Sequence, residues 1–243
     1  MRAMITLPIL LLTSASLVAC GSDETSSPAT DPTSTTSAAT TTSAPTTAPT
    51  TTSAPTTVPD GATNLGLWLP DGADDPVEAA AAFVGDVLPF GLDPIVGEFL
   101  RGDLRSGEVP VLGPETGGER AVAFVRQLGS DDRWFVIGAA SEGVRITTPE
   151  TGATVAAGPL TVEGLGRGFE STINVLAVLG DPDATMLDEE IAVGGPFGDL
   201  EPFSATLDLS DAEPGDTVIL VARGDTGLGN DPGEFTAIGV TVG

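Results

Sequence analysis

The chain has 243 residues and a formal net charge of −26 at pH 7, because 35 Asp and Glu residues outnumber nine basic residues, all of them Arg. With no His, no Lys and no Tyr, it cannot form an imidazole-based catalytic triad, a Schiff base or a lysine-containing phosphate loop. The acid excess also argues against nucleic acid as a partner, since nucleic-acid binding needs a basic surface.

Residues 1–19 predict a secretory signal peptide. Arg2 gives a positive start, and the apolar run at 4–12 is shorter than the roughly 20 residues that span a bilayer. Leu17-Val18-Ala19-Cys20-Gly21 resembles the lipobox of bacterial lipoproteins, in which cleavage leaves a lipidated cysteine as the first residue. The alternative is an ordinary signal peptide with a chance Cys. We expect lipidated Cys20, the only Cys, to anchor the protein at the extracytoplasmic face of the cell membrane.

Residues 20–62 predict a disordered tether rich in Thr, Ser, Ala and Pro. The run at 40–47 recurs at 50–57 with the same eight residues. A segment with almost no large apolar side chain cannot offset its ordering entropy by burial. Its prolines favour an extended polyproline conformation, which reaches roughly 3.1 Å per residue. We therefore expect the tether to hold the rest of the protein away from the membrane.

Residues 63–142 predict a small α+β domain that begins with a helix. Asp75-Pro76-Val77-Glu78 combines an N-cap, a proline at the first helical position and a capping-box glutamate. The spacing of apolar residues predicts one buried face, and Pro89 and Gly91 predict the end of the helix. That face comprises Val77, Ala80, Ala81, Val84 and Leu88.

The rest of this domain predicts one more helical turn and three antiparallel strands. The turn begins at Asp93-Pro94 and includes Ile95 and Phe99. Trp134, in the last strand, has two interpretations, a pocket residue or a core residue, and core is the more frequent for Trp. The three strands lie at 108–112, 119–128 and 133–140, with a tight turn at 129–132 before the last one.

Residues 143–243 predict an all-β, immunoglobulin-like sandwich. Apolar and polar residues alternate in short runs, which is typical of half-buried strands, and turn residues separate the runs. Seven candidate strands fit such a sandwich. This region has no Cys pair and no Trp, so its core must consist of Val, Ile, Leu and Phe. The alternating runs include 144–147, 159–164, 169–179, 203–209, 218–222 and 235–242.

The same region resembles the immunoglobulin-like domain of bacterial spore germination proteins. This resemblance implies a β-sandwich with an extracytoplasmic, interaction-related role, and it implies no catalytic residues. The residues that carry it are Ile146-Thr147-Thr148-Pro149, Gly152-Ala153-Thr154-Val155, the run at 159–164, Gly168-Phe169-Glu170, Gly195-Pro196-Phe197, Pro202-Phe203 and the last run at 235–242. Glu170 belongs to this pattern, and we expect it to bond the backbone or Arg167 at the end of the sheet.

Carboxylates are the remaining candidates for catalytic groups. A pair of them could in principle cleave a glycosidic bond. Asp188-Glu189-Glu190 is the main cluster, but consecutive strand residues point to opposite faces, so it is interpreted as a solvated strand edge guarded by charge. No catalytic or cofactor-binding residue is predicted.

Calcium is the most plausible ion, because hard oxygen ligands suit it. The candidates Asp225, Asn230, Asp231 and Glu234 lie in one Gly-rich loop, although their spacing is not that of an EF-hand. Asp181 with Asp183 form a second candidate, and Asp71, Asp74 and Asp75 a third. Acidic turns are usually only solvated turns.

Together these features predict a non-catalytic, membrane-anchored lipoprotein whose immunoglobulin-like domain is a binding or adaptor module in the cell envelope. Its expected partner is an envelope protein or cell-wall glycan, in spore germination or another cell-wall process. Two alternatives stay open. One is a carboxylate-based cell-wall glycan hydrolase, and the other is a structural spacer with no specific ligand.

Overall fold

The computed structural model describes residues 66–88, 95–114 and 117–243. The predicted signal peptide, Cys20 and nearly all of the predicted tether lie outside these residues. Within the described ranges, every helix is too short or too polar to cross a membrane.

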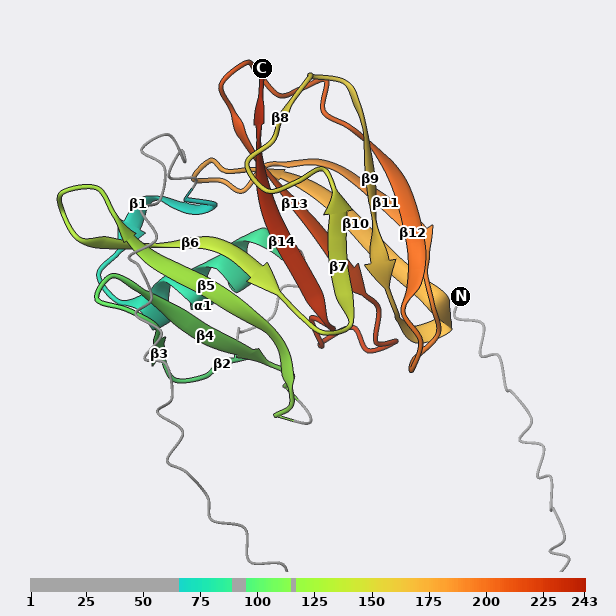
Figure 1. The fold of residues 1–243 in the computed structure, drawn as a ribbon, viewed down its shortest axis with the longest axis horizontal. Coiled ribbons are helices and arrows are strands. Elements are labelled where there is room, and N and C mark those ends of the chain that lie inside the picture. Colours follow the sequence, from blue (N-terminus) through green and yellow to red (C-terminus); the bar gives the residue numbers. More distant parts are fainter. Residues whose placement is uncertain (1–65, 89–94, 115–116) are drawn as a thin grey trace, which may run out of the picture. The chain divides into compact units, whose positions relative to one another are not determined.

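The N-terminal half of the described chain contains one helix and six strands (Figure 1). All three predicted strands are present, and the tight turn at 129–132 joins the last two. The elements are β1 (Trp68–Ala73), α1 (Pro76–Val87), β2 (Ile95–Val96), β3 (Leu100–Arg101), β4 (Ser106–Leu112), β5 (Glu119–Leu128) and β6 (Arg133–Ala140).

Helix α1 begins where the capping signal predicts. Asp75 is its N-cap, and Asp75 Oδ1 accepts hydrogen bonds from the backbone N–H groups of Val77 at 2.8 Å and Glu78 at 3.2 Å. These bonds satisfy two of the N–H groups that the first turn leaves without an intrahelical partner.

The predicted buried face of α1 is only partly right. Ala80 and Val84 are buried, but Ala81 is half-exposed, and the face also includes Ala79, Phe83 and Val87. Phe83 is fully buried and widens the apolar stripe beyond the predicted positions.

Two further elements differ from the prediction. Ile95 lies in β2, not in a helical turn, because residues 95–96 pair with Leu112 and Val111 of β4. Strand β1 was not predicted, and it pairs with β6 through Trp68 and Val136. In both cases a hydrogen-bonded partner elsewhere in the chain decides the conformation.

The C-terminal half consists of eight strands, one more than alternation predicts. The two-residue β8 is too short to alternate, and it pairs in parallel with β14. The strands are β7 (Val144–Thr148), β8 (Thr154–Val155), β9 (Pro159–Gly166), β10 (Thr172–Leu179), β11 (Met186–Val193), β12 (Glu201–Asp208), β13 (Thr217–Gly224) and β14 (Phe235–Val242).

These strands form two sheets, as in an immunoglobulin-like sandwich. One sheet has the order β12-β9-β7, and the other includes β11-β10-β13-β14. An apolar cluster lies between them, with Val162 and Leu207 from the first sheet and Val175 and Leu220 from the second, all fully buried. The core is therefore aliphatic with one aromatic, Phe203, as the composition predicts.

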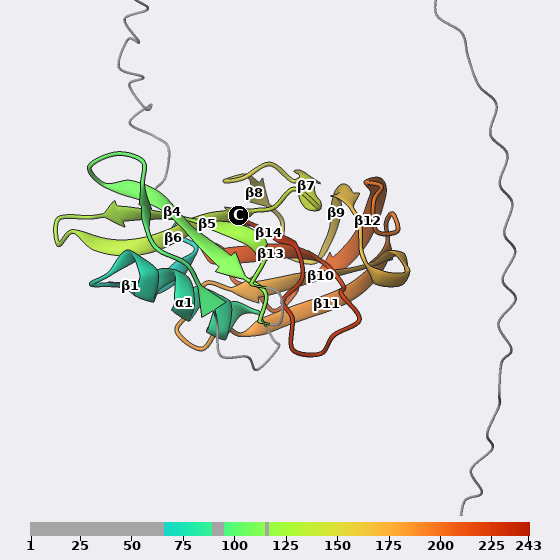
Figure 2. The same cartoon turned by 90° about the horizontal axis from the view of Figure 1, so that it is seen from below.

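The second sheet continues into the N-terminal half through β14 and β6, which meet at Ala237 and Ala139 (Figure 1). As a result, β10 and β13 are buried on both faces. On β10, Val175 faces the sandwich core, while Leu176 belongs to a second apolar cluster that includes Phe83 of α1. Figure 2 shows α1 along one face of the strands β4 to β6.

Trp134 belongs to this second cluster. The residue is 7% exposed, and its ring meets that of Phe99 edge to face with centroids 5.2 Å apart. The core interpretation of Trp134 is therefore confirmed.

Candidate functional site

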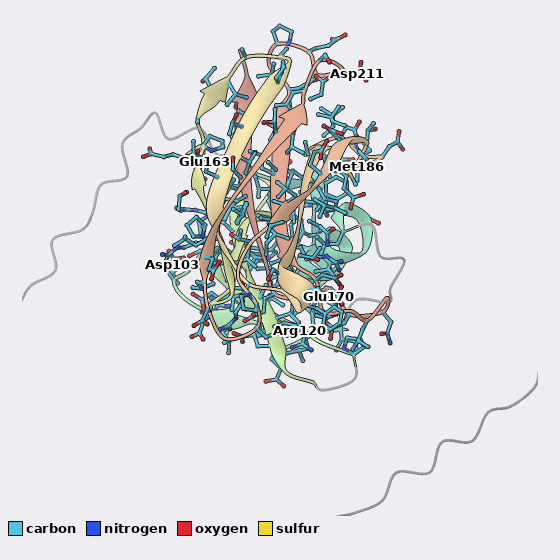
Figure 3. The ribbon with its side chains drawn as sticks, turned by 90° about the vertical axis from the view of Figure 1, so that its right-hand side faces the viewer. Asp103, Arg120, Glu163, Glu170, Met186 and Asp211 are labelled. Carbon is cyan, nitrogen blue, oxygen red and sulfur yellow. The ribbon has the colours of Figure 1, made fainter. Side chains whose placement is uncertain are left out.

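Three loops and strand β13 of the sandwich, together with one strand of the N-terminal half, line an open hollow of about 470 Å³. We call it the junction hollow. Figure 3 shows Arg120 and Glu170 at this end of the molecule, with Met186 and Asp211 toward the other end. The lining residues come from β5, the β9–β10 loop (167–171), the β11–β12 loop (194–200), β13 and the β13–β14 loop (225–234). They are Arg120, Arg167, Phe197, Gly198, Gly224, Thr226, Leu228, Asp231 and Glu234.

Arg120 of β5 and Asp231 form the central contact of the hollow. Arg120 Nε donates to Asp231 Oδ1 at 2.9 Å, and Arg120 Nη2 donates to Asp231 Oδ2 at 2.6 Å. The Asp231 side chain is 0% exposed, while that of Arg120 is 20% exposed. Asp231 Oδ1 also accepts the backbone N–H of Gly233 at 2.9 Å. Gly233 has a φ of +70°, which lets the loop turn back onto the carboxylate that precedes it.

A second bidentate pair lies beside the first. Arg167 Nε and Nη2 donate to Glu234 Oε2 and Oε1, each at 3.0 Å. Both side chains are partly exposed. Gly143 lies against the Glu234 carboxylate so closely that a Cβ there would clash with it. A side chain at position 143 would therefore push the Glu234 carboxylate from its place beside Arg167.

Arg223 supports the same loop from within the sheet. It is 7% exposed on β13, and its Nη1 donates to the backbone oxygens of Asp231 at 3.3 Å and Pro232 at 3.4 Å. Its Nη2 lies 3.7 Å from Asp225 Oδ1. Burial lowers the pKa of Arg223, although the charges of Asp225, Glu189 and Asp231 oppose that shift.

The electrostatics of the pairs favour their charged forms. Burial by itself would raise the pKa of Asp231, but the hydrogen bonds from Arg120 and Gly233 and the charges of Arg120 and Arg223 hold that pKa below its ordinary value. The hydrogen bond to Asp231 raises the pKa of Arg120. The hydrogen bond to Glu234 likewise raises the pKa of Arg167. The β13–β14 loop is thus held by three arginines.

Exposed apolar side chains surround this charged centre. Phe197 and Leu228 line the hollow and are 59% and 43% exposed. Phe169 of the β9–β10 loop is also 43% exposed and lies over Gly227, where a Cβ would come within 3.0 Å of its ring. A group of exposed apolar side chains on loops that a rigid framework holds is typical of an interaction surface.

The four calcium candidates do lie in one loop, but they do not converge. Asp231 and Glu234 each face a different arginine with both carboxylate oxygens. Asp225 Oδ1 accepts the backbone N–H of Gly227 at 3.1 Å, and Asn230 is exposed. The described residues include no group of three or more His, Cys, Asp or Glu that could hold a metal ion. Calcium would have to displace two arginines, and its binding stays a prediction.

The other acidic turns have structural partners. Asp181 accepts the backbone N–H and the hydroxyl of Thr185 at 3.0 and 2.9 Å. Asp74 pairs with Arg133, whose Nε donates to the backbone oxygen of Asp71 at 3.2 Å, and Asp75 caps α1. These bonds account for the carboxylates of Asp74, Asp75 and Asp181 without an ion.

The cluster at 188–190 lies on β11, at the end of the sheet, as interpreted. Asp188 Oδ2 accepts the backbone N–H of Asp208 on β12 at 2.7 Å. Of the two partners expected for Glu170, Arg167 is wrong, because Arg167 pairs with Glu234 instead. Glu170 is exposed and has a left-handed backbone, with a φ of +52°.

The sequence reasoning missed the roles of Arg120 and Arg223. One signal was available: in a chain with 35 acids, each of only nine Arg residues has many potential partners. An Arg within an apolar alternating run, as in both cases, indicates a buried or half-buried ion pair. Which acid it meets depends on the fold.

One known family model matches the sandwich part of the chain. Residues 143–227 match the family model Gmad2, described as the immunoglobulin-like domain of bacterial spore germination. The match confirms the resemblance in the C-terminal part and covers β7 to β13, together with two of the three loops of the junction hollow. No curated protein matches the chain.

Proposed function

We propose that this protein is a non-catalytic lipoprotein that binds a partner in the cell envelope through the loop end of its immunoglobulin-like domain. The observation that carries the proposal is the junction hollow with its exposed Phe197, Leu228 and neighbouring Phe169. Arginine pairs hold the loops of Phe169 and Leu228, and backbone hydrogen bonds between Gly195 and residues 166 and 168 hold the start of the loop of Phe197. Such loops can present these side chains without a large ordering cost on binding.

The family description supports this class of role. A domain named for bacterial spore germination suits work in the cell envelope, in germination or another cell-wall process. Fold alone does not fix function, so the partner is proposed only by class, an envelope protein or a cell-wall glycan.

The proposed location follows from the N-terminal sequence. Lipidation of Cys20 would anchor the chain at the extracytoplasmic face, and the Thr/Ser/Pro-rich tether would carry the folded part away from the membrane. The strong negative charge opposes direct docking on anionic lipid, so the lipid is the proposed link to the membrane.

The hydrolase alternative has weaker support. A carboxylic general acid needs a raised pKa. The pKa shifts that are resolved for carboxyl groups are all downward. The Arg105 backbone N–H and the Ser106 hydroxyl lower the pKa of Asp103, and Ser210 lowers that of Asp208. Arg120 keeps the pKa of Asp231 low despite burial.

Affinity purification of the full-length chain in mild detergent tests the proposal. Because the chain has no Lys, amine-directed crosslinkers have at most its N-terminal amine to react with, and purification avoids that limit. The wild type should be compared with Phe197→Ser/Leu228→Ser. Met186→Ser, at an exposed apolar residue at the other end of β11, is the matched control.

The proposal expects an envelope protein or wall fragment to co-purify with the wild type and the control and to be lost with the double variant. Equal recovery with all three chains would exclude the loop end as the binding surface. Recovery with none would favour the structural spacer.

A further inference from the structure

Strand β11 forms an open edge of the larger sheet. Its only backbone ladder in the described part of the chain is with β10. Strand β12 of the other sheet packs beside the first half of β11, where the Asp208 N–H donates to Asp188 Oδ2 at 2.7 Å. Most residues of β11 are exposed. In Figure 1, β11 and β12 lie at the side of the sandwich away from the N-terminal half. An unpaired edge offers backbone N–H and C=O groups to another strand.

The register shows which groups face outward. Gly194 N–H donates to Ser171 O at 2.8 Å, in continuation of the β10–β11 ladder, in which Thr172 lies opposite Val193. In an antiparallel pair, hydrogen-bonded and non-hydrogen-bonded positions alternate. Ala192 therefore bonds toward β10, whereas Ile191 and Val193 direct their N–H and C=O groups to the open side.

The two halves of this edge differ in chemistry. Ile191 and Val193 are 70% and 77% exposed, which is unusual for neighbouring β-branched residues on a strand edge. The other half carries Asp188, Glu189 and Glu190, and the Glu189 N–H is already bonded to Asp188 Oδ1 at 2.9 Å. Charge is a common guard against pairing at an edge. In β11, charged residues occupy only the first half of the edge.

The carboxylates of β11 indicate which kind of strand could pair with its open half. A second copy of the chain would bring a net charge of −26 and, on its own β11, three more carboxylates and no basic residue. A strand that carries Lys or Arg would instead meet the acidic half with complementary charge and the apolar half with its own apolar side chains.

We propose that β11 is a docking edge for an extended basic segment of a partner protein, which adds to the sheet as a further strand. Main-chain bonds to Ile191 and Val193 would give affinity, and the carboxylates at 188–190 would select basic side chains. None of these residues lines the junction hollow, so this surface is additional to the one proposed above.

Two nine-residue peptides serve as probes, one alternating Lys with Val and one alternating Glu with Val. Each is titrated into the isotope-labelled full-length chain, and amide shifts and amide exchange are followed by NMR. The Lys–Val peptide is expected to shift β11 amides and to slow exchange at Ile191 and Val193. Its affinity should fall in about 1 M salt, where screening reaches about 3 Å. The Glu–Val peptide should not bind.

Two variants test the mechanism separately. Ile191→Pro removes an outward N–H that the β10 ladder does not use, so it should abolish binding while the sheet persists. Glu189→Gln/Glu190→Gln, which keeps the backbone intact, should weaken binding about tenfold through the loss of two ion pairs. Glu163→Gln on β9 of the other sheet is the control for removal of an acidic charge elsewhere and should bind as the wild type does.

Equal binding of the two peptides, shifts centred on another surface, or no binding of the Lys–Val peptide at millimolar concentration would each overturn the proposal. So would a dimer of the chain that Ile191→Pro dissociates, since the occupant would then be a second copy. A negative result here leaves the purification test of the loop end unaffected, because the variant that should lose the partner in that test changes only Phe197 and Leu228, which lie outside β11.

Discussion

Arg120 and Asp231 are 111 positions apart in the chain, yet they form a bidentate ion pair with a shortest distance of 2.6 Å. Arg120 comes from β5 of the N-terminal half, and Asp231 from a loop of the sandwich. The pair therefore links the continuous sheet to the loop that carries Leu228. We expect it to fix the junction hollow as well as to stabilise the fold.

The Asp231 carboxylate is expected to matter far more than an exposed one. Asp231→Asn removes the charge that compensates Arg120 and should lower the free energy of unfolding by about 3 kcal/mol, the usual cost of breaking a buried pair. Asp132→Asn breaks the exposed Arg105–Asp132 pair, with side chains 46% and 67% exposed, and should cost less than about 1 kcal/mol. Urea denaturation of both variants checks this, and equal losses would contradict it.

The same pair predicts a dependence of stability on pH. The folded-state pKa of Asp231 lies below its unfolded value of about 3.9, because the contributions of Arg120, Gly233 and Arg223 exceed the opposing effect of burial. Its stabilisation is complete above the unfolded pKa and is lost as pH falls through the folded pKa. The difference in stability between wild type and Asp231→Asn should be constant above about pH 5 and shrink below about pH 4.

Urea titrations at a series of pH values measure this difference. A difference that stays constant to pH 2, or that grows as the pH falls, would rule out the ion pair as its origin.

Helix α1 gives a local test of the fold. Asp75→Ala removes the acceptor of two N–H groups and should cost about 1 kcal/mol. Asp86 lies in the last turn, where the helix dipole disfavours a negative charge. Asp86→Ala should therefore leave the stability unchanged or raise it slightly. Thermal and urea unfolding of the two variants compare them directly, and a larger loss for Asp86→Ala would contradict the capping role.

Local signals predicted the elements that local contacts determine. The Asp75 cap and the strand at 133–140 were both predictable because N-capping and strand alternation depend on residues close in sequence. Ile95 shows the limit of this reasoning. Asp93-Pro94 before it predicts a helical turn, but pairing with Leu112 of β4 places Ile95 in a strand.

The candidate site was less predictable for the same reason. The loop with Asp231 and Glu234 was singled out, but as an ion site, since carboxylates in one loop are visible in the sequence and their distant partners are not. Arg120 and Arg167 meet these acids only after β5, β9 and the β13–β14 loop come together. Likewise, the exposure of Ile191 and Val193 depends on β11 being the last strand of its sheet.

Lipidation of Cys20 can be tested by mass. The wild-type protein should begin at Cys20 and carry diacylglycerol, and it should partition with membranes. Cys20→Ser should lack the lipid mass and keep its signal peptide, because the lipobox requires the thiol. A wild-type protein cut near residue 19 without added lipid would identify an ordinary signal peptide instead.

The central claim is that the loop end of the sandwich binds a partner, and photo-crosslinking in whole cells tests it most directly. A photoreactive residue placed at Phe197, which is 59% exposed beside the junction hollow, should give one reproducible adduct. The same residue placed at the exposed Asp211, toward the other end of the molecule in Figure 3, should not give it. The same adducts from both positions, or none from Phe197, would contradict the claim.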